Sequence, residues 1–194
     1  MGVDEVGRGP LAGNVVAAAV VLPVVLPTSL TKLTDSKKLT ENQRLSLVRP
    51  IIKHAVAYGV ARVGPSTIDE INILQATLRA MHVAVTKAAQ RLSGVPDIVL
   101  VDGNRPIPNL NLPQMTLVKG DARSFAIAAA SILAKVVRDR EMVLADRQFP
   151  AYGFARHKGY GTVAHRQALS QFGLSPLHRR SFKWRSVPER GRNG

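Results

Sequence analysis

The chain of 194 residues contains no cysteine. This absence excludes disulfide bonds, thiolate ligation of zinc or of an iron–sulfur cluster, and a cysteine nucleophile. Any metal site must therefore use oxygen or imidazole ligands, and the composition fits the reducing cytoplasm in which we expect the protein to act. With 45% hydrophobic residues, a chain of this length can bury one good core, so we expect a single domain.

Long hydrophobic runs are also missing. The most apolar stretch covers residues 15–22 and continues after Pro23 through residues 24–26, which is too short to span a bilayer. No basic region precedes this stretch, as a signal peptide would require. We therefore expect no membrane segment and no signal peptide, and nothing in the sequence demands more than a monomer.

Acidic residues are few, because 13 Asp and Glu stand against 27 Lys and Arg, for a formal net charge of +14. Such an excess favours binding to nucleic acid, although a ribosome-associated or simply basic protein would share it. Residues 151–194 hold nine of the basic residues and one acid, and seven of the nine aromatic residues lie between Phe149 and Trp184. This segment suits a surface that pairs with phosphates and stacks on sugars or bases. Alternatively, most of its rings pack the segment onto the core.

Hydrophobic patterning predicts an α/β fold. Short β-rich runs at residues 2–6, 14–22, 55–63, 97–101 and 114–118 predict a mixed five-stranded sheet. Flanking helices are predicted from about residue 66 to 92, with Ser66 or Thr67 as the cap, and from about residue 122 to 148. The second helix should bury one stripe and leave Arg138 off it; the stripe is Phe125, Ala129, Ile132, Val136, Val143 and Leu144.

These patterns divide the chain into three parts. Residues 1–150 form the predicted catalytic core, and residues 151–185 form a basic, helical C-terminal segment that packs on the core and contacts substrate. Residues 186–194 have the composition of a flexible tail.

Several carboxylates stand at the ends of predicted strands. Asp4 and Glu5 follow the first residues of the first strand, Asp102 follows residues 98–101, and Asp121 precedes the second long helix. Carboxylates gathered at one edge of a sheet cannot all stay ionised unless a cation neutralises them, and hard oxygen donors select Mg²⁺ or Mn²⁺. We therefore expect a two-cation site that hydrolyses phosphodiesters without a side-chain nucleophile. Taken alone, Asp121 fits better as an N-cap.

Asp4 and Glu5 also pose a question of geometry. Neighbouring residues of a strand point to opposite faces of the sheet, so one of the two must reach the metals from a strand end, a twist or a bulge. We expect Asp4 to be the better-placed ligand.

A series of motifs extends over residues 2–182. The motifs, in chain order, are GVDEVGRGPLAG (2–13), DSKKLT (35–40), ILQAT (73–77), VDGN (101–104), KGDARS (119–124), AAASILAK (128–135), HKGYGT (157–162) and HRRSF (178–182). Together they resemble the bacterial ribonuclease HII family, in the family's own order. Only three residues precede Asp4, whereas the family usually has several more, so we expect the native start to lie upstream.

The resemblance implies an RNase H-like fold and a metal-dependent endoribonuclease. Such an enzyme cuts 5' to a ribonucleotide in RNA/DNA hybrids and at RNA–DNA junctions in DNA duplexes. It leaves 3'-hydroxyl and 5'-phosphate ends and removes misincorporated ribonucleotides. The metal-binding and catalytic set implied by the family pattern is Asp4, Glu5, Asp102 and Asp121. The resemblance further implies that Gly7, Arg8 and Gly9 sense the ribose 2'-hydroxyl, and that Tyr160 stacks on the sugar of the following deoxyribonucleotide.

Elementary chemistry supports parts of this assignment. Glycines at positions 7 and 9 let the backbone approach a sugar closely, and they also suit a tight turn between the first two strands. Tyr160 lies between two glycines, where a large ring has little structural purpose unless something covers it.

The remaining basic and imidazole side chains are interpreted from the residues alone. Lys37 and Lys38 are predicted phosphate contacts, although a solvated loop face explains at least one of them equally well. His157, His165 and His178 could each touch phosphate, and their spacing disfavours a zinc site.

Two other functions compete with this interpretation. Ribonuclease HIII or a DNA-junction nuclease would share the carboxylates but lack the combination of Gly7-Arg8-Gly9 with Tyr160. A non-catalytic basic module would explain the charge, but not four carboxylates whose negative charge opposes phosphate binding.

Overall fold

The computed structural model describes residues 1–186 and contains one five-stranded sheet. Its strands are β1 (Gly2–Val6), β2 (Val15–Val21), β3 (Ala57–Val63), β4 (Val99–Asp102) and β5 (Gln114–Leu117), in the order β3-β2-β1-β4-β5. Strands β1, β2 and β3 pair in antiparallel fashion, whereas β4 runs parallel to both β1 and β5. The predicted mixed five-stranded sheet is therefore confirmed.

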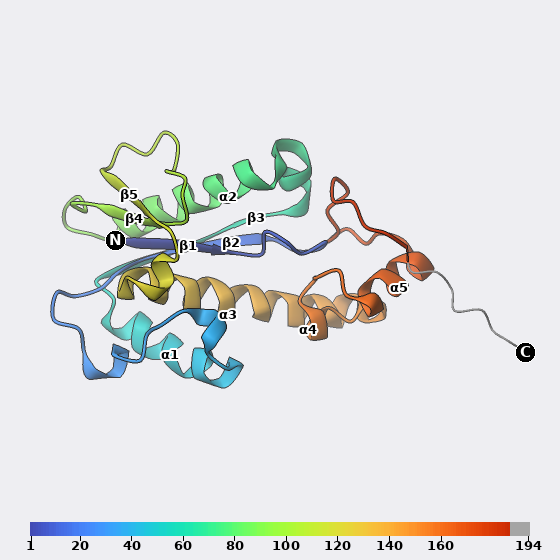
Figure 1. The fold of residues 1–194 in the computed structure, drawn as a ribbon, viewed down its shortest axis with the longest axis horizontal. Helices are drawn as coiled ribbons and strands as arrows, with labels where there is room; N and C mark the ends of the chain where they lie inside the picture. Colours follow the sequence, from blue (N-terminus) through green and yellow to red (C-terminus); the bar gives the residue numbers. More distant parts are fainter. Residues whose placement is uncertain (187–194) are drawn as a thin grey trace, which may run out of the picture.

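Helices cover both faces of this sheet (Figure 1). The helices are α1 (Glu41–His54), α2 (Pro65–Ala89), α3 (Phe125–Gln148), α4 (Phe154–His157) and α5 (Val163–Phe172), with short 3-10 helices η1 (Thr28–Leu30), η2 (Ser36–Lys38), η3 (Gly120–Ala122) and η4 (Pro150–Tyr152). Helix α2 lies on one face, and α3 with α1 lies on the other. No helix among residues 1–186 is long and apolar enough to cross a membrane.

The two faces of the sheet bury separate cores, because alternate strand residues point to opposite sides. Val3 packs in the core under α2, while Val6 packs against the core under α3. Asp4 lies between them in sequence and shares the α3 side with Val6. A third cluster joins the end of α3 to the C-terminal segment and contains Met142, Tyr152, Phe154 and Leu169.

The predicted helices needed several corrections. Helix α1 was not predicted, although Thr40 and Gln43 form a capping box at its start. Neither Ser66 nor Thr67 caps α2, whose N-cap is Gly64. Asn72 also interrupts α2 with a φ of 66°, and its side chain accepts hydrogen bonds from the N–H groups of Leu74 and Gln75.

The stripe predicted for α3 was wrong at both ends. Phe125 and Leu144 are about half exposed, whereas Arg138, predicted to lie off the stripe, is fully buried. Arg138 is buried because its guanidinium donates to the carbonyls of Asn14 and Ala12 in the loop after β1. A buried cation can be satisfied by backbone carbonyls, and hydrophobic patterning does not reveal this.

The C-terminal segment returns to the core after α3 (Figure 1). Tyr152 and Phe154 are buried there, as the packing alternative predicted for most of the aromatic residues, while Tyr160 and Phe172 stay about half exposed. Apart from Ser186, the tail predicted at residues 186–194 lies outside the described residues.

Candidate active site

Asp4 and Glu5 occupy adjacent positions on the central strand β1 and face opposite sides of the sheet. Asp4 is buried on the α3 side, where Oδ1 accepts the N–H of Glu5 at 2.7 Å. Glu5 faces the α2 side and lies 3.5 Å from Nη1 of Arg8. The two carboxylates therefore flank the strand instead of sitting side by side.

Asp102 ends the neighbouring strand β4, and Asp121 lies in η3. Oδ1 of Asp102 accepts the N–H of Gly120 at 2.7 Å, which ties the end of β4 to the turn that carries Asp121. Lys119 opens this turn in the left-handed region, with a φ of 55°. Asp121 is buried but does not cap α3, because Ser124 is the N-cap and accepts the N–H of Ile127. The N-cap alternative for Asp121 is therefore wrong.

Burial and neighbouring acids raise the pKa values of three of these carboxyl groups. Burial raises the pKa of Asp4 well above its ordinary range, and the charges of Glu5 and Asp102 raise it further. Burial also raises the pKa of Glu5, although Arg8 opposes this shift. For Asp121, burial and then the charges of Asp35 and Asp102 raise the pKa. Asp4, Glu5 and Asp121 thus resist ionisation because they are buried and because acidic side chains lie near them.

The side chains of the four carboxylates do not converge on one point. Among residues 1–186, no three acidic or histidine side chains surround a position at ligating distance. Like charges repel, and Glu5 turns toward Arg8. Glu5 and Asp102 instead line a hollow of about 180 Å³, next to Arg8 and Asn104. A set of carboxylate oxygens suits a hard divalent cation, which would offset the repulsion and draw the carboxylates together.

Asp35 is a site residue that sequence reasoning missed. Its carboxylate caps η2 by accepting the N–H of Lys37 at 2.9 Å, and its charge helps to raise the pKa of Asp121. Burial opposes ionisation of Asp35, but the Lys37 N–H, the Asp121 side chain and the charges of Lys37 and Lys38 lower its pKa overall. Asp35 is the first residue of the DSKKLT motif, and its place in that motif could have identified it.

The predicted substrate-reading residues lie together although they are far apart in sequence. Gly7 has a φ of 93°, and a Cβ added there would collide with the Arg138 side chain. A Cβ added to Gly9 would lie 3.7 Å from Cε1 of Tyr160. Arg8, between the two glycines, is exposed. The Gly7–Gly9 loop and the Tyr160 ring therefore form two sides of one surface, reached from β1 and from the C-terminal segment.

Lys37 and Lys38 are exposed on η2, next to Asp35. This position is compatible both with phosphate contacts and with the solvated loop face. Two of the histidine predictions are corrected, because His165 and His178 are buried with 0% and 3% exposure and cannot touch phosphate. They contact each other through their Nε2 atoms at 2.9 Å.

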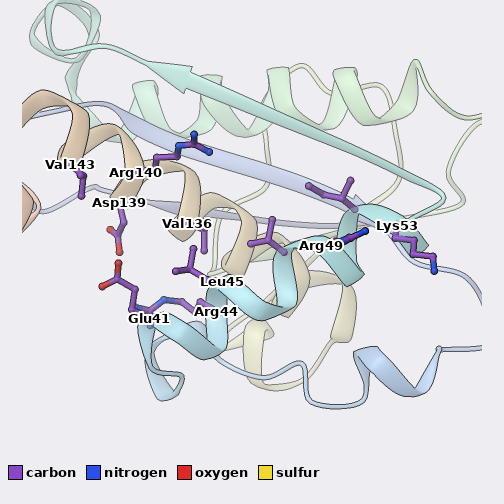
Figure 2. Close-up of a pocket in the computed structure, with 11 residues that line it drawn as sticks. Glu41, Arg44, Leu45, Arg49, Lys53, Val136, Asp139, Arg140 and Val143 are labelled. Carbon is purple, nitrogen blue, oxygen red and sulfur yellow. The ribbon is translucent and has the colours of Figure 1, made fainter.

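A separate groove of about 680 Å³ lies between α1 and α3 (Figure 2). Its lining includes the apolar Leu45 and Val136 and the basic Arg49, Lys53 and Arg140. None of the predicted site residues lines it. The groove is therefore separate from the carboxylate edge of the sheet.

Comparisons with known proteins agree with this architecture. The family model described as Ribonuclease HII matches residues 1–185. A ribonuclease HII from Syntrophotalea carbinolica is 53% identical over 182 residues, which cover 94% of this chain and 84% of the relative. The crystal structure of ribonuclease H2 from Pyrococcus horikoshii aligns with a TM-score of 0.76 at 29% identity, covering 94% of this chain and 92% of that one. The PCNA:RNase HII complex from Archaeoglobus fulgidus aligns at 0.73 and 27% identity, covering 96% of each chain.

Proposed function

The chain belongs to the ribonuclease HII family and is a metal-dependent endoribonuclease, and we propose that it reads the junction between a ribonucleotide and the deoxyribonucleotide that follows it. In this proposal it hydrolyses the phosphodiester on the 5' side of the ribonucleotide. The products carry a 3'-hydroxyl and a 5'-phosphate. Its substrates are RNA/DNA hybrids and DNA duplexes that contain ribonucleotides, which would place it in the cytoplasm with the chromosome.

The observation that carries this proposal is the approach of Gly9 to Tyr160 beside the carboxylate edge. A loop without side chains at positions 7 and 9 can bring its backbone against a ribose, whose 2'-hydroxyl distinguishes RNA from DNA. A half-exposed ring 3.7 Å from the Cβ that Gly9 lacks can cover the next sugar. One surface thus offers a polar contact for one nucleotide and an apolar contact for its neighbour.

Asp4, Glu5, Asp102 and Asp121 are the residues that would hold the metal ions. Bound Mg²⁺ or Mn²⁺ supplies an activated water and stabilises the leaving oxygen in an in-line displacement. The chain itself orients the donors, because Asp102 is fixed by the Gly120 N–H and Asp4 by the Glu5 N–H. Arg8 neutralises Glu5 and stays exposed beside it, where a phosphate would arrive. Lys37 and Lys38 would contact the backbone of the duplex from the other side of the site.

The experiment is gel-resolved cleavage of a DNA duplex with one ribonucleotide, beside an all-RNA/DNA hybrid and an all-DNA duplex. Each substrate is tested with Mg²⁺, Mn²⁺ or EDTA. We expect a metal-dependent cut 5' to the single ribonucleotide and no cut in the all-DNA duplex. Cleavage of the RNA/DNA hybrid alone would still support the proposed metal site, but it would refute the proposed recognition of the RNA–DNA junction.

Tyr160→Ala tests the stacking role directly. We expect it to lower kcat/KM on the single-ribonucleotide duplex by roughly tenfold to a hundredfold, because stacking on a ring contributes about 1 to 3 kcal/mol. Phe172→Ala is the matched control, since its ring is 51% exposed against 46% for Tyr160 and lies in the same segment. Equal losses in the two variants would remove the specific role of Tyr160.

A further inference from the structure

Three segments that are far apart in sequence lie side by side at the edge of the proposed substrate surface. Leu11 N–H donates to the carbonyl of Gly159 at 2.8 Å, Gly13 N–H to Leu177 at 2.8 Å, and Arg179 N–H to Leu11 at 2.9 Å. Ala12 and His178 form an antiparallel bridge between two of these segments. The backbones that carry the Gly7–Gly9 loop and Tyr160 are therefore joined to residues 177–179.

Arg179 holds the loop after β1 from inside. Its fully buried guanidinium donates five hydrogen bonds of 2.6 to 3.0 Å, which end on the carbonyls of Gly7, Arg8, Pro10 and Gly13. Burial, followed by the charge of Arg138, lowers the pKa of Arg179 to about 9, so it remains a cation at neutral pH. A planar fork of five donors can bind several carbonyls at once, and a lysine ammonium cannot reproduce that geometry.

His178 holds the Tyr160 segment through a second histidine, and the backbone fixes where the protons lie. Ser175 N–H donates to Nδ1 of His178 at 2.9 Å, so in the neutral ring the hydrogen is on Nε2. The carbonyl of Tyr160 can only accept, so Nδ1 of His165, 2.9 Å away, carries the hydrogen of that ring. Nε2 of His165 is thus a bare acceptor, and Nε2–H of His178 donates to it at 2.9 Å.

From this geometry we propose that His178 and Arg179 are a positioning pair that sets Tyr160 relative to the Gly7–Gly9 loop. Adjacent residues of an extended segment point to opposite sides, so His178 reaches the Tyr160 carbonyl through His165 while Arg179 reaches the loop carbonyls. This inference rests on the proposed recognition of the RNA–DNA junction. It adds that the selectivity for the junction depends on the spacing between the Gly7–Gly9 loop and Tyr160. Residues that touch neither nucleotide set this spacing.

The first test separates positioning from support of the fold. The readout is the ratio of kcat/KM for the single-ribonucleotide duplex to kcat/KM for the all-RNA/DNA hybrid. His178→Phe keeps an aromatic ring in the cluster but removes the donor, so we expect the ratio to fall about tenfold, the effect of one hydrogen bond. In a Tyr160→Ala background the same substitution should change the ratio by less than about twofold, because the residue through which it acts is gone.

His178→Gln is the conservative variant, since its amide can donate to Nε2 of His165, and we expect it to recover most of the ratio. If His178→Phe lowers the ratio equally in both Tyr160 backgrounds, the role of His178 is structural and the assignment is overturned.

The unmodified enzyme separates the two proposals, because failure to cut the single-ribonucleotide duplex would refute the junction reading before any variant is compared. Long-range proton–nitrogen NMR of the histidines then tests the relay independently of cleavage, and hydrogens on other nitrogens would refute it.

Arg179→Lys tests the other half of the pair. We expect kcat/KM to fall about a hundredfold on both ribonucleotide substrates, mainly through kcat, because several loop carbonyls lose directed donors. Arg180→Met, which removes a cation from the exposed neighbouring side chain, is the control and should change either substrate by less than about threefold. If Arg179→Lys matches this control, the loop does not depend on Arg179.

Discussion

The carboxylate edge differs from the C-terminal polar cluster, which consists of His165, His178 and Arg179. The difference lies in whether buried polar side chains have partners within the protein. At the edge, burial and the charges of neighbouring acids raise the pKa values of Asp4, Glu5 and Asp121. In the cluster, buried donors end on backbone carbonyls or, for His178, on the ring of His165, so the chain satisfies them by itself. The difference separates a site that needs a ligand from a scaffold that is complete on folding.

Removing one acid should have the largest effect and should separate activity from stability. For Asp4→Asn we expect cleavage to fall on the order of 10³-fold, because a principal oxygen donor is weakened. In EDTA the same variant should melt a few degrees higher than the parent, since one of several mutually repelling charges is gone. Cleavage assays and thermal melts check the two halves, and full activity of Asp4→Asn would refute the metal centre.

Removing a charged side chain from the C-terminal cluster should lower the stability of the protein, whereas removing Asp4 should raise it. Arg179→Met leaves four loop carbonyls without their donor, and we expect it to lower the free energy of unfolding by about 4 kcal/mol. Denaturant unfolding measures the loss, with Arg180→Met as the exposed control. A loss no greater than that of the control would show that water replaces the guanidinium readily.

Acid should also distinguish the two regions. Burial lowers the pKa of His165 and of His178 to about 4, below the ordinary 6.5. Their neutral rings contribute stability that is complete above pH 6.5 and is lost as the pH falls through 4, by roughly 3 kcal/mol per ring. The raised pKa of Asp4 has the opposite sign, because its contribution is lost as the pH rises. Melts from pH 4 to 8 should slope less in His178→Phe, and an unchanged slope would contradict this account.

Mg²⁺ should stabilise the protein only through the carboxylate edge of the sheet. At a Mg²⁺ concentration one hundred times the dissociation constant, we expect the free energy of unfolding to rise by about 2.7 kcal/mol relative to EDTA. Asp4→Asn should respond less, while Arg180→Met should respond fully. A Mg²⁺ titration followed by thermal melting makes the comparison, and equal responses in all three proteins would place the bound ion elsewhere.

The smallest expected effect belongs to Asp35, which touches the edge from outside the predicted ligand set. Asp35→Asn should lower kcat/KM about tenfold, because it removes a negative charge that lies near Asp121. Glu41→Gln, which removes an exposed carboxylate from the start of α1, is the matched control. Kinetics on the hybrid substrate suffice, and equal rates in the two variants would leave Asp35 as a simple cap of η2.

Sequence reasoning succeeded where local pattern and three-dimensional position coincide. Residues 2–6 and 98–101 are short β-rich runs, and Asp102 directly follows the second, so both strands could be predicted. Helix α1 was missed because it is polar overall and contains Pro50, although its capping box was readable. The burial of Arg138, Arg179 and His178 could not be predicted, since their partners are carbonyls more than 100 residues away or a neighbouring histidine.

The contact of residues 177–179 with residues 11–13 has a consequence for the order of synthesis. About 165 residues separate the two segments, so the loop after β1 gains its last hydrogen bonds only when residues 177–179 have left the ribosome. Until then the Arg179 fork is absent, and neighbouring carbonyls remain in water. In a nascent chain Asp4 and Glu5 are therefore made long before the residues that complete the loop after β1.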